Sequence, residues 1–321
     1  MASSGENIVT LRFEILDLHP FKCMLEILKG FRDMFTFRFW PTYIEIFAKG
    51  TSASGKEDDE KSKHRYVIYG EKILNYQYPI TEINGVKVPV HPHFSIEVKA
   101  SDIINLSKGQ NREATFDASI KIDMDSSICK GMFINPVATA RSLSAVKVVP
   151  VHSCHLGRPP EIIDYYERFY ATRTSLSFPD RLHSVGMPNS RLSTTAFSKC
   201  LVDMKSCTRF DLSLGEDGHI DFNCFRGPDF VIGGTLPESG LDIAVTQEAN
   251  PRSIVDLGED MSIVDEEIHT VSLNIKHVEW LGAIDKLAKM SILEVYMEKG
   301  YPLVLRTNLG LFGHATFILD N

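Results

Sequence analysis

The chain has 321 residues, of which 43% are hydrophobic and 24% are charged, so it has the length of two ordinary domains and ample apolar material for a buried core. Its formal net charge of -8 at pH 7 excludes a protein whose whole surface attracts nucleic acid. Any contact with nucleic acid must therefore come from a local basic patch on an acidic background.

The first residues have neither the basic nor the apolar region of a secretory signal, and no apolar run approaches the roughly 20 residues that span a bilayer. We therefore expect an intracellular protein without a membrane partner. The cysteines are scattered and form no CxxC pair, so we also expect reduced thiols. They are Cys23, Cys129, Cys154, Cys200, Cys207 and Cys224.

Alternating polar and apolar residues over 8–17 predict a half-buried strand at the start of the chain. Pro20 then begins an amphipathic stretch, in which apolar residues recur at helical spacing as far as Phe31. A second, shorter helix is predicted to begin at Ser101 or Asp102. The period-two runs that predict further strands are 34–48, 65–70, 75–83, 85–100 and 114–136.

The irregular, proline-punctuated segment 137–186 is interpreted as a long connector, after which the same order of patterns begins again. A helix is predicted from Asn189 or Ser190 onward, and the Asp-Gly pair at 217–218 lies between alternating runs, which is a strong hairpin signal. A strand and a helix follow in 269–290, and strands close the chain. Because strand, helix, several strands, short helix and hairpin occur twice, we predict two similar α+β domains with two helices each.

Four short motifs occur in the order and spacing found in one protein family. They are Lys22-Cys-Met-Leu-Glu-Ile-Leu-Lys29, Phe197-Ser-Lys199-Cys-Leu-Val-Asp203, Trp280-Leu-Gly-Ala-Ile-Asp-Lys286, and Tyr301-Pro-Leu-Val-Leu-Arg306 with the closing segment 310–319. They resemble helices and closing strands of the DNA sliding clamps of the proliferating cell nuclear antigen (PCNA) family. The chain is longer than a typical clamp, with extra residues in 49–65, 150–180 and 247–267, which fits a divergent member such as one from a large DNA virus.

The resemblance implies an α+β DNA clamp fold of two similar domains, each with antiparallel sheets outside and two helices lining the inner face. We expect an N-terminal clamp domain at 1–143, an interdomain connector with an insertion at 144–180, and a C-terminal clamp domain at 181–321. Family members are non-catalytic processivity factors that encircle duplex DNA, so the resemblance implies a homotrimeric ring. It also implies double-stranded DNA without sequence preference, a DNA polymerase, other peptide-motif proteins of replication and repair, and a clamp loader as partners, in the nucleus or at a viral replication site.

A clamp that slides needs phosphate contacts without base readout, which basic residues on its helices would supply. Lys22 and Lys29 are seven apart and so share one helix face, whereas Val202 stands where the family often has a basic residue. The alternative is that these lysines are ordinary solvated side chains of amphipathic helices. On the four predicted helices, the predicted DNA-binding residues are Lys22, Lys29, Arg32, Lys108, Arg191, Lys199, Lys205, Lys276, Lys286 and Lys289, of which the resemblance supports Lys22, Lys29, Lys199 and Lys286 most directly.

Family members also bind peptides in a groove between their domains, where a short helix inserts apolar anchors. The residues predicted for this groove are Leu156, Ile162, Pro302 and Ile318. The alternative for Pro302 and Ile318 is ordinary strand packing. The family's rings close by pairing of edge strands between subunits, for which 116–123 and 208–225 are the candidates.

The sequence contains none of the motifs GxxxxGK[ST], GxGxxG, HExxH and GxSxG, so we expect no enzyme and no catalytic residues. His152, Cys154 and His155, with His91 and His93, are the densest group of metal-ligand types, but they lack a second spaced pair of ligands. We therefore expect no metal and no cofactor. A further alternative keeps the clamp fold: a subunit of a hetero-oligomeric checkpoint ring, or a viral transcription or replication accessory factor that does not slide.

Overall fold

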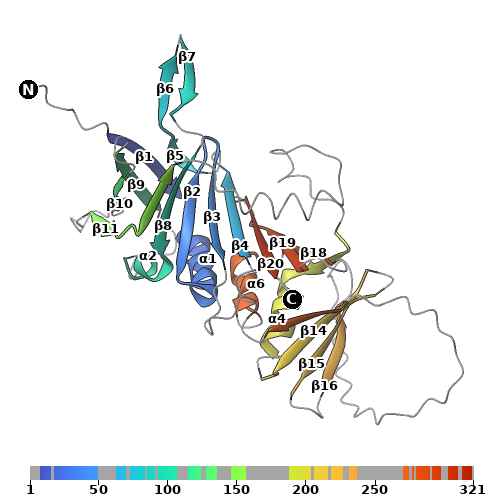
Figure 1. Ribbon diagram of the computed structural model, residues 1–321. Helices are drawn as coiled ribbons and strands as arrows, with labels where there is room; N and C mark the ends of the chain where they lie inside the picture. Colours follow the sequence, from blue (N-terminus) through green and yellow to red (C-terminus); the bar gives the residue numbers. More distant parts are fainter. Residues whose placement is uncertain are drawn as a thin grey trace, which may run out of the picture. The chain divides into compact units, whose positions relative to one another are not determined.

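In the computed structural model the chain forms two compact units (Figure 1). The structure describes residues 8–15, 18–49, 63–69, 73–83, 85–90, 93–106, 115–123, 128–135, 146–156, 188–203, 206–215, 218–226, 231–236, 270–274, 277, 280–289, 291–297, 303–309 and 313–319. Of these, the first unit holds the residues between 8 and 156 together with 309 and 313–316, and the second holds those between 188 and 308 together with 317–319.

The first unit contains helices α1 and α2 and two antiparallel sheets, whose strands lie in the orders β11-β10-β9-β1-β5 and β12-β8-β2-β3-β4-β20. The separate hairpin β6–β7 projects from these sheets (Figure 1). The elements are β1 (Ile8–Ile15), α1 (Leu18–Phe31), β2 (Met34–Phe39), β3 (Tyr43–Lys49), β4 (Lys63–Tyr69), β5 (Leu74–Gln77), β6 (Ile80–Ile83), β7 (Val86–Pro89), β8 (Phe94–Lys99), α2 (Ala100–Leu106), β9 (Phe116–Asp123), β10 (Ile128–Asn135), β11 (Lys147–Val149), β12 (Ser153–Leu156) and the first residues of β20 (Gly313–Leu319).

The second unit contains α4 and α6 with antiparallel strands in the orders β16-β15-β14-β17 and β13-β18-β19. Its elements are β13 (Ser190–Ser193), α4 (Thr194–Asp203), β14 (Arg209–Leu214), β15 (Ile220–Phe225), β16 (Val231–Leu236), β17 (Thr270–Asn274), α6 (Ile284–Leu287), β18 (Ile292–Tyr296) and β19 (Leu303–Asn308).

The two units repeat one topology. In each, a first strand leads through a helix into a three-stranded meander, and a later strand pairs with the first strand of that meander, as β8 does with β2 and β17 with β14. A second helix and a hairpin then return to the first strand, where β9 pairs with β1 and β18 with β13. The predicted fold of two similar α+β halves is therefore confirmed. The boundaries at 143 and 180 stay a prediction, and β11 and β12, within the predicted connector, pair with strands of the first unit.

The core of the first unit lies between its two sheets. The predicted alternation along β1 is confirmed, because Leu11, Phe13 and Ile15 are buried while Arg12 is exposed. The Phe13 ring lies 5.4 Å from the ring of Phe39 in β2, on the opposite sheet. Aromatic side chains from both sheets therefore form one continuous apolar layer.

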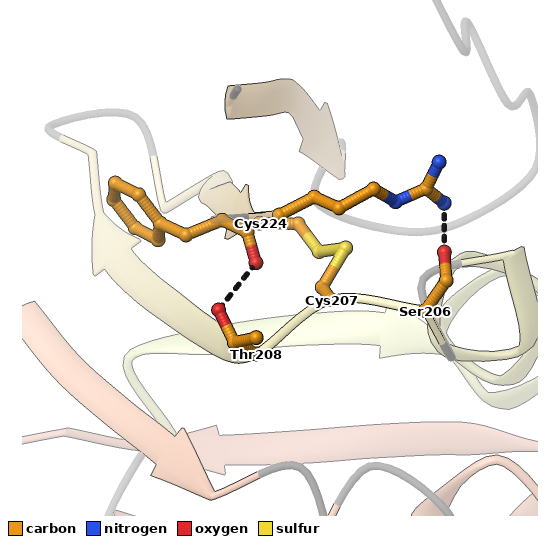
Figure 2. The surroundings of a disulfide bond; sticks show 6 residues. Ser206, Cys207, Thr208 and Cys224 are labelled. Atoms are coloured by element: carbon orange, nitrogen blue, oxygen red, sulfur yellow. Dashed lines mark hydrogen bonds between the residues drawn. A yellow bond between two sulfur atoms is a disulfide. The ribbon is translucent and has the colours of Figure 1, made fainter. Parts of the chain in front are cut away.

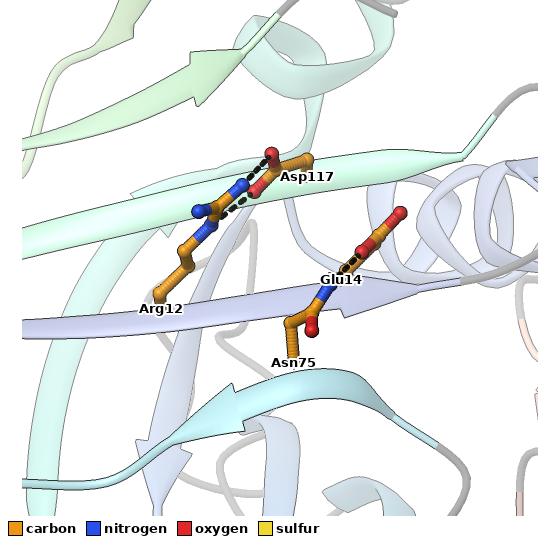
Figure 3. Close-up of polar contacts among 4 residues, drawn as sticks. All are labelled: Arg12, Glu14, Asn75 and Asp117. Carbon is orange, nitrogen blue, oxygen red and sulfur yellow. Dashed lines mark hydrogen bonds and ion pairs between the residues drawn. The ribbon is translucent and has the colours of Figure 1, made fainter.

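The other face of β1 is polar and carries both signs of charge (Figure 3). The strand register places Glu14 opposite Asp117, two like charges that would repel each other. Arg12 resolves this conflict by donating two hydrogen bonds to the Asp117 carboxylate, at 3.2 and 2.7 Å, and Asn75 of β5 donates to Glu14. This face of the sheet is therefore not a basic surface.

A buried ion pair joins β2 to β3. Arg38 Nη1 donates to Glu45 Oε2 at 2.8 Å, and both side chains are only 2% exposed. Trp40 Nε1 donates to the same carboxylate oxygen at 3.3 Å, and the Arg38 guanidinium lies 4.4 Å from the centre of the Phe47 ring. Each charge depends on the other, because neither can reach bulk water.

A close backbone approach fixes the beginning of β20 beside β4. Gly313 has a φ of +127°, and a Cβ atom added there would lie 2.0 Å from the carbonyl oxygen of Val67. Only glycine fits this position without a shift of the backbone.

A disulfide joins Cys207, just before β14, to Cys224 in β15 (Figure 2). Both cysteines are buried, and next to them the N–H and the hydroxyl of Thr208 donate to the carbonyl oxygen of Phe225, at 2.7 and 3.0 Å. The expectation of reduced thiols is wrong for this pair. The two residues are 17 apart in the sequence, and the antiparallel pairing of β14 with β15 brings them together.

Three details of the predicted elements are wrong. The helix expected from Asn189 or Ser190 begins at Thr194, and the preceding residues form β13. The strand at 116–123 is not an edge, because β9 lies between β1 and β10. Within 208–225, neither β14 nor β15 is an edge, since β17 and β16 flank them.

Candidate nucleic-acid interface

Two lysines lie on one face of α1. Lys29 is exposed and Lys22 is half-buried, and their separation of seven residues places them on the same side of the helix. Glu26 is also exposed and lies one turn from each. Burial lowers the pKa of Lys22, and the neighbouring Glu26 carboxylate opposes this shift because it favours the charged amine. The face therefore carries two amines with one carboxylate between them.

Asp33, two residues beyond the end of α1, holds the amino end of α2. Its carboxylate accepts hydrogen bonds from the N–H and the hydroxyl of Ser101, at 2.8 and 2.7 Å, and its carbonyl oxygen accepts one from the N–H of Ala100 at 2.8 Å. At the other end of α2, Lys147 of β11 donates to the carbonyl oxygen of Leu106 at 2.6 Å. Both charges complement the helix dipole, so α2 is held at both ends beside α1.

Hydroxyl groups of α4 hold it against α6 in the second unit. Thr194 donates to the carbonyl oxygen of Ala288 at 2.7 Å, and Thr195 donates to the carboxylate of Asp285 at 2.6 Å. Ser198 donates to the carbonyl oxygen of Gly282. The helix pair is therefore held by directed polar bonds as well as by apolar packing.

Exposed lysines lie on this helix pair as well. Lys199 of α4 and Lys286 of α6 are exposed, and so is Lys289, which follows α6. Val202 of α4 is 43% exposed, so an apolar side chain occupies part of the helix surface. Among the described residues, the first unit thus presents basic side chains on α1, and the second presents them on α4 and α6.

The remaining predicted DNA-binding residues are placed as follows. Arg32 is half-exposed directly after α1. The placement of Arg191 on a helix is wrong, because it lies in β13 opposite Glu294 of β18, although its side chain is exposed. Lys108, Lys205 and Lys276 lie outside the described residues.

The residues predicted for a peptide groove are only partly described. Leu156 lies in β12 opposite Phe94, and Ile318 in β20 is 2% exposed, which is what ordinary strand packing gives. Ile162 and Pro302 lie outside the described residues. Their role in binding a partner stays a prediction.

Within the described part of the chain, no three His, Cys, Asp or Glu side chains gather closely enough to hold a metal ion. His93 is buried against the Trp40 ring at 4.6 Å, while His152 and His155 are exposed and His91 is not among these residues. Over the same ranges, no helix has the length and apolar character needed to cross a bilayer.

The residues that position the helices were missed by sequence reasoning. Asp33 is far in sequence from the helix that it holds, and no local pattern links it to Ser101. Ser193 had a detectable signal, because its hydroxyl accepts a hydrogen bond from the N–H of Ala196 at 3.3 Å and so caps α4. Asn189 and Ser190 are equally good capping residues, so the sequence alone does not show which of the three begins the helix.

No protein-family model and no curated protein sequence matches the chain. Solved structures do match it over nearly the whole length. The structure of a PCNA2–PCNA3 complex from Sulfolobus tokodaii matches with a TM-score of 0.58 at 14% identity, over 96% of this chain and 98% of that one. The proliferating cellular nuclear antigen of Entamoeba histolytica matches with a TM-score of 0.57 at 10% identity, over 97% and 98%. With its repeated topology and its helix pairs, the chain therefore has the fold of the PCNA-type DNA sliding clamps.

Proposed function

We propose that the chain is a DNA sliding clamp, a non-catalytic processivity factor whose ring encircles duplex DNA. The observation that carries the proposal is the repeated topology, with a braced pair of helices in each unit and exposed Lys29, Lys199 and Lys286 on them. Basic side chains that meet phosphates hold DNA without reading its sequence. With a formal net charge of -8, the rest of the surface favours DNA contact only at such places.

Ring closure needs free sheet edges, and two edge strands of the described sheets are suited to it. β16 carries no charged residue, and its Val231 is 48% exposed. β11 ends the sheet of the first unit, and Val148 on it is also exposed. An edge strand without charges or prolines, such as β16, is a template for pairing with another chain. β11 carries Lys147, whose amine donates to the carbonyl oxygen of Leu106. We propose that β16 of one copy pairs with β11 of the next, in a homotrimer.

The likeness in fold to the PCNA structures also supports a proposal about partner binding. We propose that DNA polymerase and other proteins of replication and repair dock by short peptides that include an apolar helix turn. Leu156 and Ile318, with Ile162 and Pro302, are the proposed contacts, and a clamp loader is a further proposed partner. The described part of the chain contributes Leu156 from β12 and Ile318 from β20.

A trapping experiment tests the encircling of DNA and does not need a loader. The chain is incubated with a linear duplex whose biotinylated ends are then blocked with streptavidin, and the complex is passed through a gel-filtration column. A ring that has threaded over an end stays on the blocked duplex and leaves when a restriction enzyme cuts the DNA. Equal retention on blocked and unblocked duplexes would overturn the proposal.

A mass measurement in solution tests ring closure. Light scattering is expected to give three times the chain mass, and Val231→Lys, which places a charge on the β16 edge, is expected to lower it. Ile83→Lys is the matched control, because Ile83 is similarly exposed but lies on the separate β6–β7 hairpin. A trimer that Val231→Lys leaves intact would refute the proposed pairing.

The second candidate is a clamp-fold subunit of a hetero-oligomeric ring, or an accessory factor that does not slide. It is favoured by the weakened positive charge of the helices, where Glu26 separates two lysines and Val202 is exposed. The matching structure from Sulfolobus tokodaii is a complex of two different PCNA chains. A chain that stays monomeric at every concentration would favour this candidate.

A further inference from the structure

Two thiols of the first unit meet between its two sheets. Cys129 lies on β10 of one sheet and Cys154 lies on β12 of the other, and both are half-buried. The two side chains are within hydrogen-bonding contact. Neither residue belongs to the helix pairs or to the edges proposed for ring closure. The proposed clamp function therefore gives the two thiols no role.

A β-bulge turns Cys129 inward. Met132 on β10 is buried, so strict alternation would place residue 128 inward and Cys129 outward. The register shifts between Cys129 and Gly131, so residue 130 is inserted between two paired positions. This insertion, next to Gly131 with its φ of +137°, reverses the alternation. As a result Cys129 lies opposite buried Ile122, and Ile128 is 59% exposed. The bulge leaves an apolar residue in solvent and places a thiol in the interior.

The register of the other sheet turns Cys154 toward the same layer. Cys154 lies opposite Ile96 of β8, and Ile96 lies opposite Phe37 of β2, so the three share one face of the sheet. That face meets the first sheet, because the Phe37 ring lies 6.1 Å from the ring of Phe13 in β1. The two cysteines therefore approach each other from facing sheets, at the margin of the core where solvent still reaches them.

The two thiols are chemically unequal. The pKa of Cys129 is lowered, mainly because the Cys154 thiol donates a hydrogen bond to its sulfur, while burial acts against this shift and the Gly131 N–H supports it. The pKa of Cys154 is raised, chiefly by the same hydrogen bond and then by burial. The backbone N–H of Cys129 acts in the opposite direction and lowers the pKa of Cys154. A thiolate is the attacking species in disulfide exchange, and two half-buried thiols that share a hydrogen bond can supply it.

We propose that Cys129 and Cys154 form a reversible disulfide that responds to small-molecule disulfides such as oxidised glutathione. The Cys129 thiolate attacks one glutathione sulfur, and the other glutathione leaves as a thiolate. Cys154 then loses its proton to solvent and attacks Cys129 Sγ, expelling the second glutathione. Two protein thiols are oxidised by two electrons, and one glutathione disulfide is reduced to two thiols.

The bond would tie β12 to β10 and therefore to the sheet that contains β1. At present β12 pairs only with β8 among the described strands, and it is the last described element before the chain continues toward the second unit. Oxidation would thus fix β12, the last described strand of this part of the chain, to the facing sheet. The buried Cys207–Cys224 bond is different in kind, because both its cysteines are almost fully inaccessible to small thiols.

The test uses the full chain in a series of glutathione buffers from reducing to oxidising. Free thiols are trapped by acid quenching and alkylation, and the peptides are identified by mass spectrometry. We expect Cys129 and Cys154 to lose alkylation together as a linked peptide, at a buffer composition where buried Cys23 and Cys200 remain reduced. Hydrogen exchange of the β12 amides is expected to slow in the oxidised chain.

Single variants separate a true pair from general oxidation. Each single variant, Cys154→Ser or Cys129→Ser, should leave the remaining cysteine as a stable mixed disulfide with glutathione, because the second thiol that would expel glutathione is missing. The inference is overturned if no linked peptide appears in any buffer, or if Cys129 and Cys154 become linked no earlier than buried Cys23 and Cys200 are oxidised. Because the readout is chemical, neither outcome depends on whether the chain encircles DNA.

Discussion

Neutralising two of the exposed helix lysines should change how DNA binding depends on salt. In the double variant Lys29→Gln/Lys199→Gln, each unit loses one positive charge from its helices, and both side chains are exposed, so the fold should tolerate the change. Each phosphate contact contributes about 0.9 to the slope of log affinity against log salt. If both lysines contact phosphates, the slope should fall by about 1.8 for each chain on the DNA.

The size of this effect is measurable. Between 50 and 200 mM salt, a slope difference of about 1.8 corresponds to roughly a twelvefold difference in the loss of affinity. Fluorescence anisotropy of a labelled duplex, titrated with the chain at several salt concentrations, gives the slope directly. Duplexes of different sequence should give the same result, because phosphate contacts carry no sequence information.

A second double variant provides the matched control. Lys87→Gln/Lys121→Gln removes the same charge from exposed strand positions, on the β6–β7 hairpin and on β9. If the helices face DNA, the control should keep the wild-type slope. The reasoning is refuted if both double variants reduce the slope equally, since only net charge would then matter, or if Lys29→Gln/Lys199→Gln leaves it unchanged.

Three further predictions concern stability, measured by denaturant unfolding. Glu45→Ala should lower the free energy of unfolding by about 3–5 kcal/mol, because it leaves the buried charge of Arg38 without its partner. Arg38→Met combined with Glu45→Leu removes both charges and should lower it far less. Equal losses in the two variants would contradict this account. Replacing both Cys207 and Cys224 by Ala should lower the free energy of unfolding by about 3 kcal/mol, because the disulfide closes a loop of 17 residues. An unchanged midpoint of denaturant unfolding would show that the bond is not formed. Gly313→Ala should cost more than about 1 kcal/mol, because its Cβ meets a carbonyl oxygen of β4, and a neutral result would show that the backbone there is free to shift.

Most elements of the fold could be predicted from the local periodicity of apolar residues. The alternation in 8–15 and the helical spacing up to Phe31 are properties of single segments, and both elements form where they were predicted. The beginning of α4 was predicted too early because Asn189, Ser190 and Ser193 can all cap a helix. Only the pairing of residues 190–193 with β18 decides among them, and that pairing is not a local property.

The candidate interface was predictable in part for the same reason. Lys22 and Lys29 share a helix face by spacing alone, and the structure bears out that geometry. The hydrogen bonds that hold the helices in place, such as that from Thr195 to Asp285, join segments that no local pattern connects. The edge strands were misjudged because a strand's neighbours depend on the whole sheet, and the sequence of β9 is the same whether one or two strands flank it.

The uncharged edge of β16 has a consequence for how many copies of the chain can assemble. A head-to-tail contact sets no limit on copy number, because each added chain again offers the same two edges. Only the angle between successive copies decides whether the series returns to its start or continues as a filament. A small change in that angle would therefore convert a finite assembly into fibres whose length rises with protein concentration.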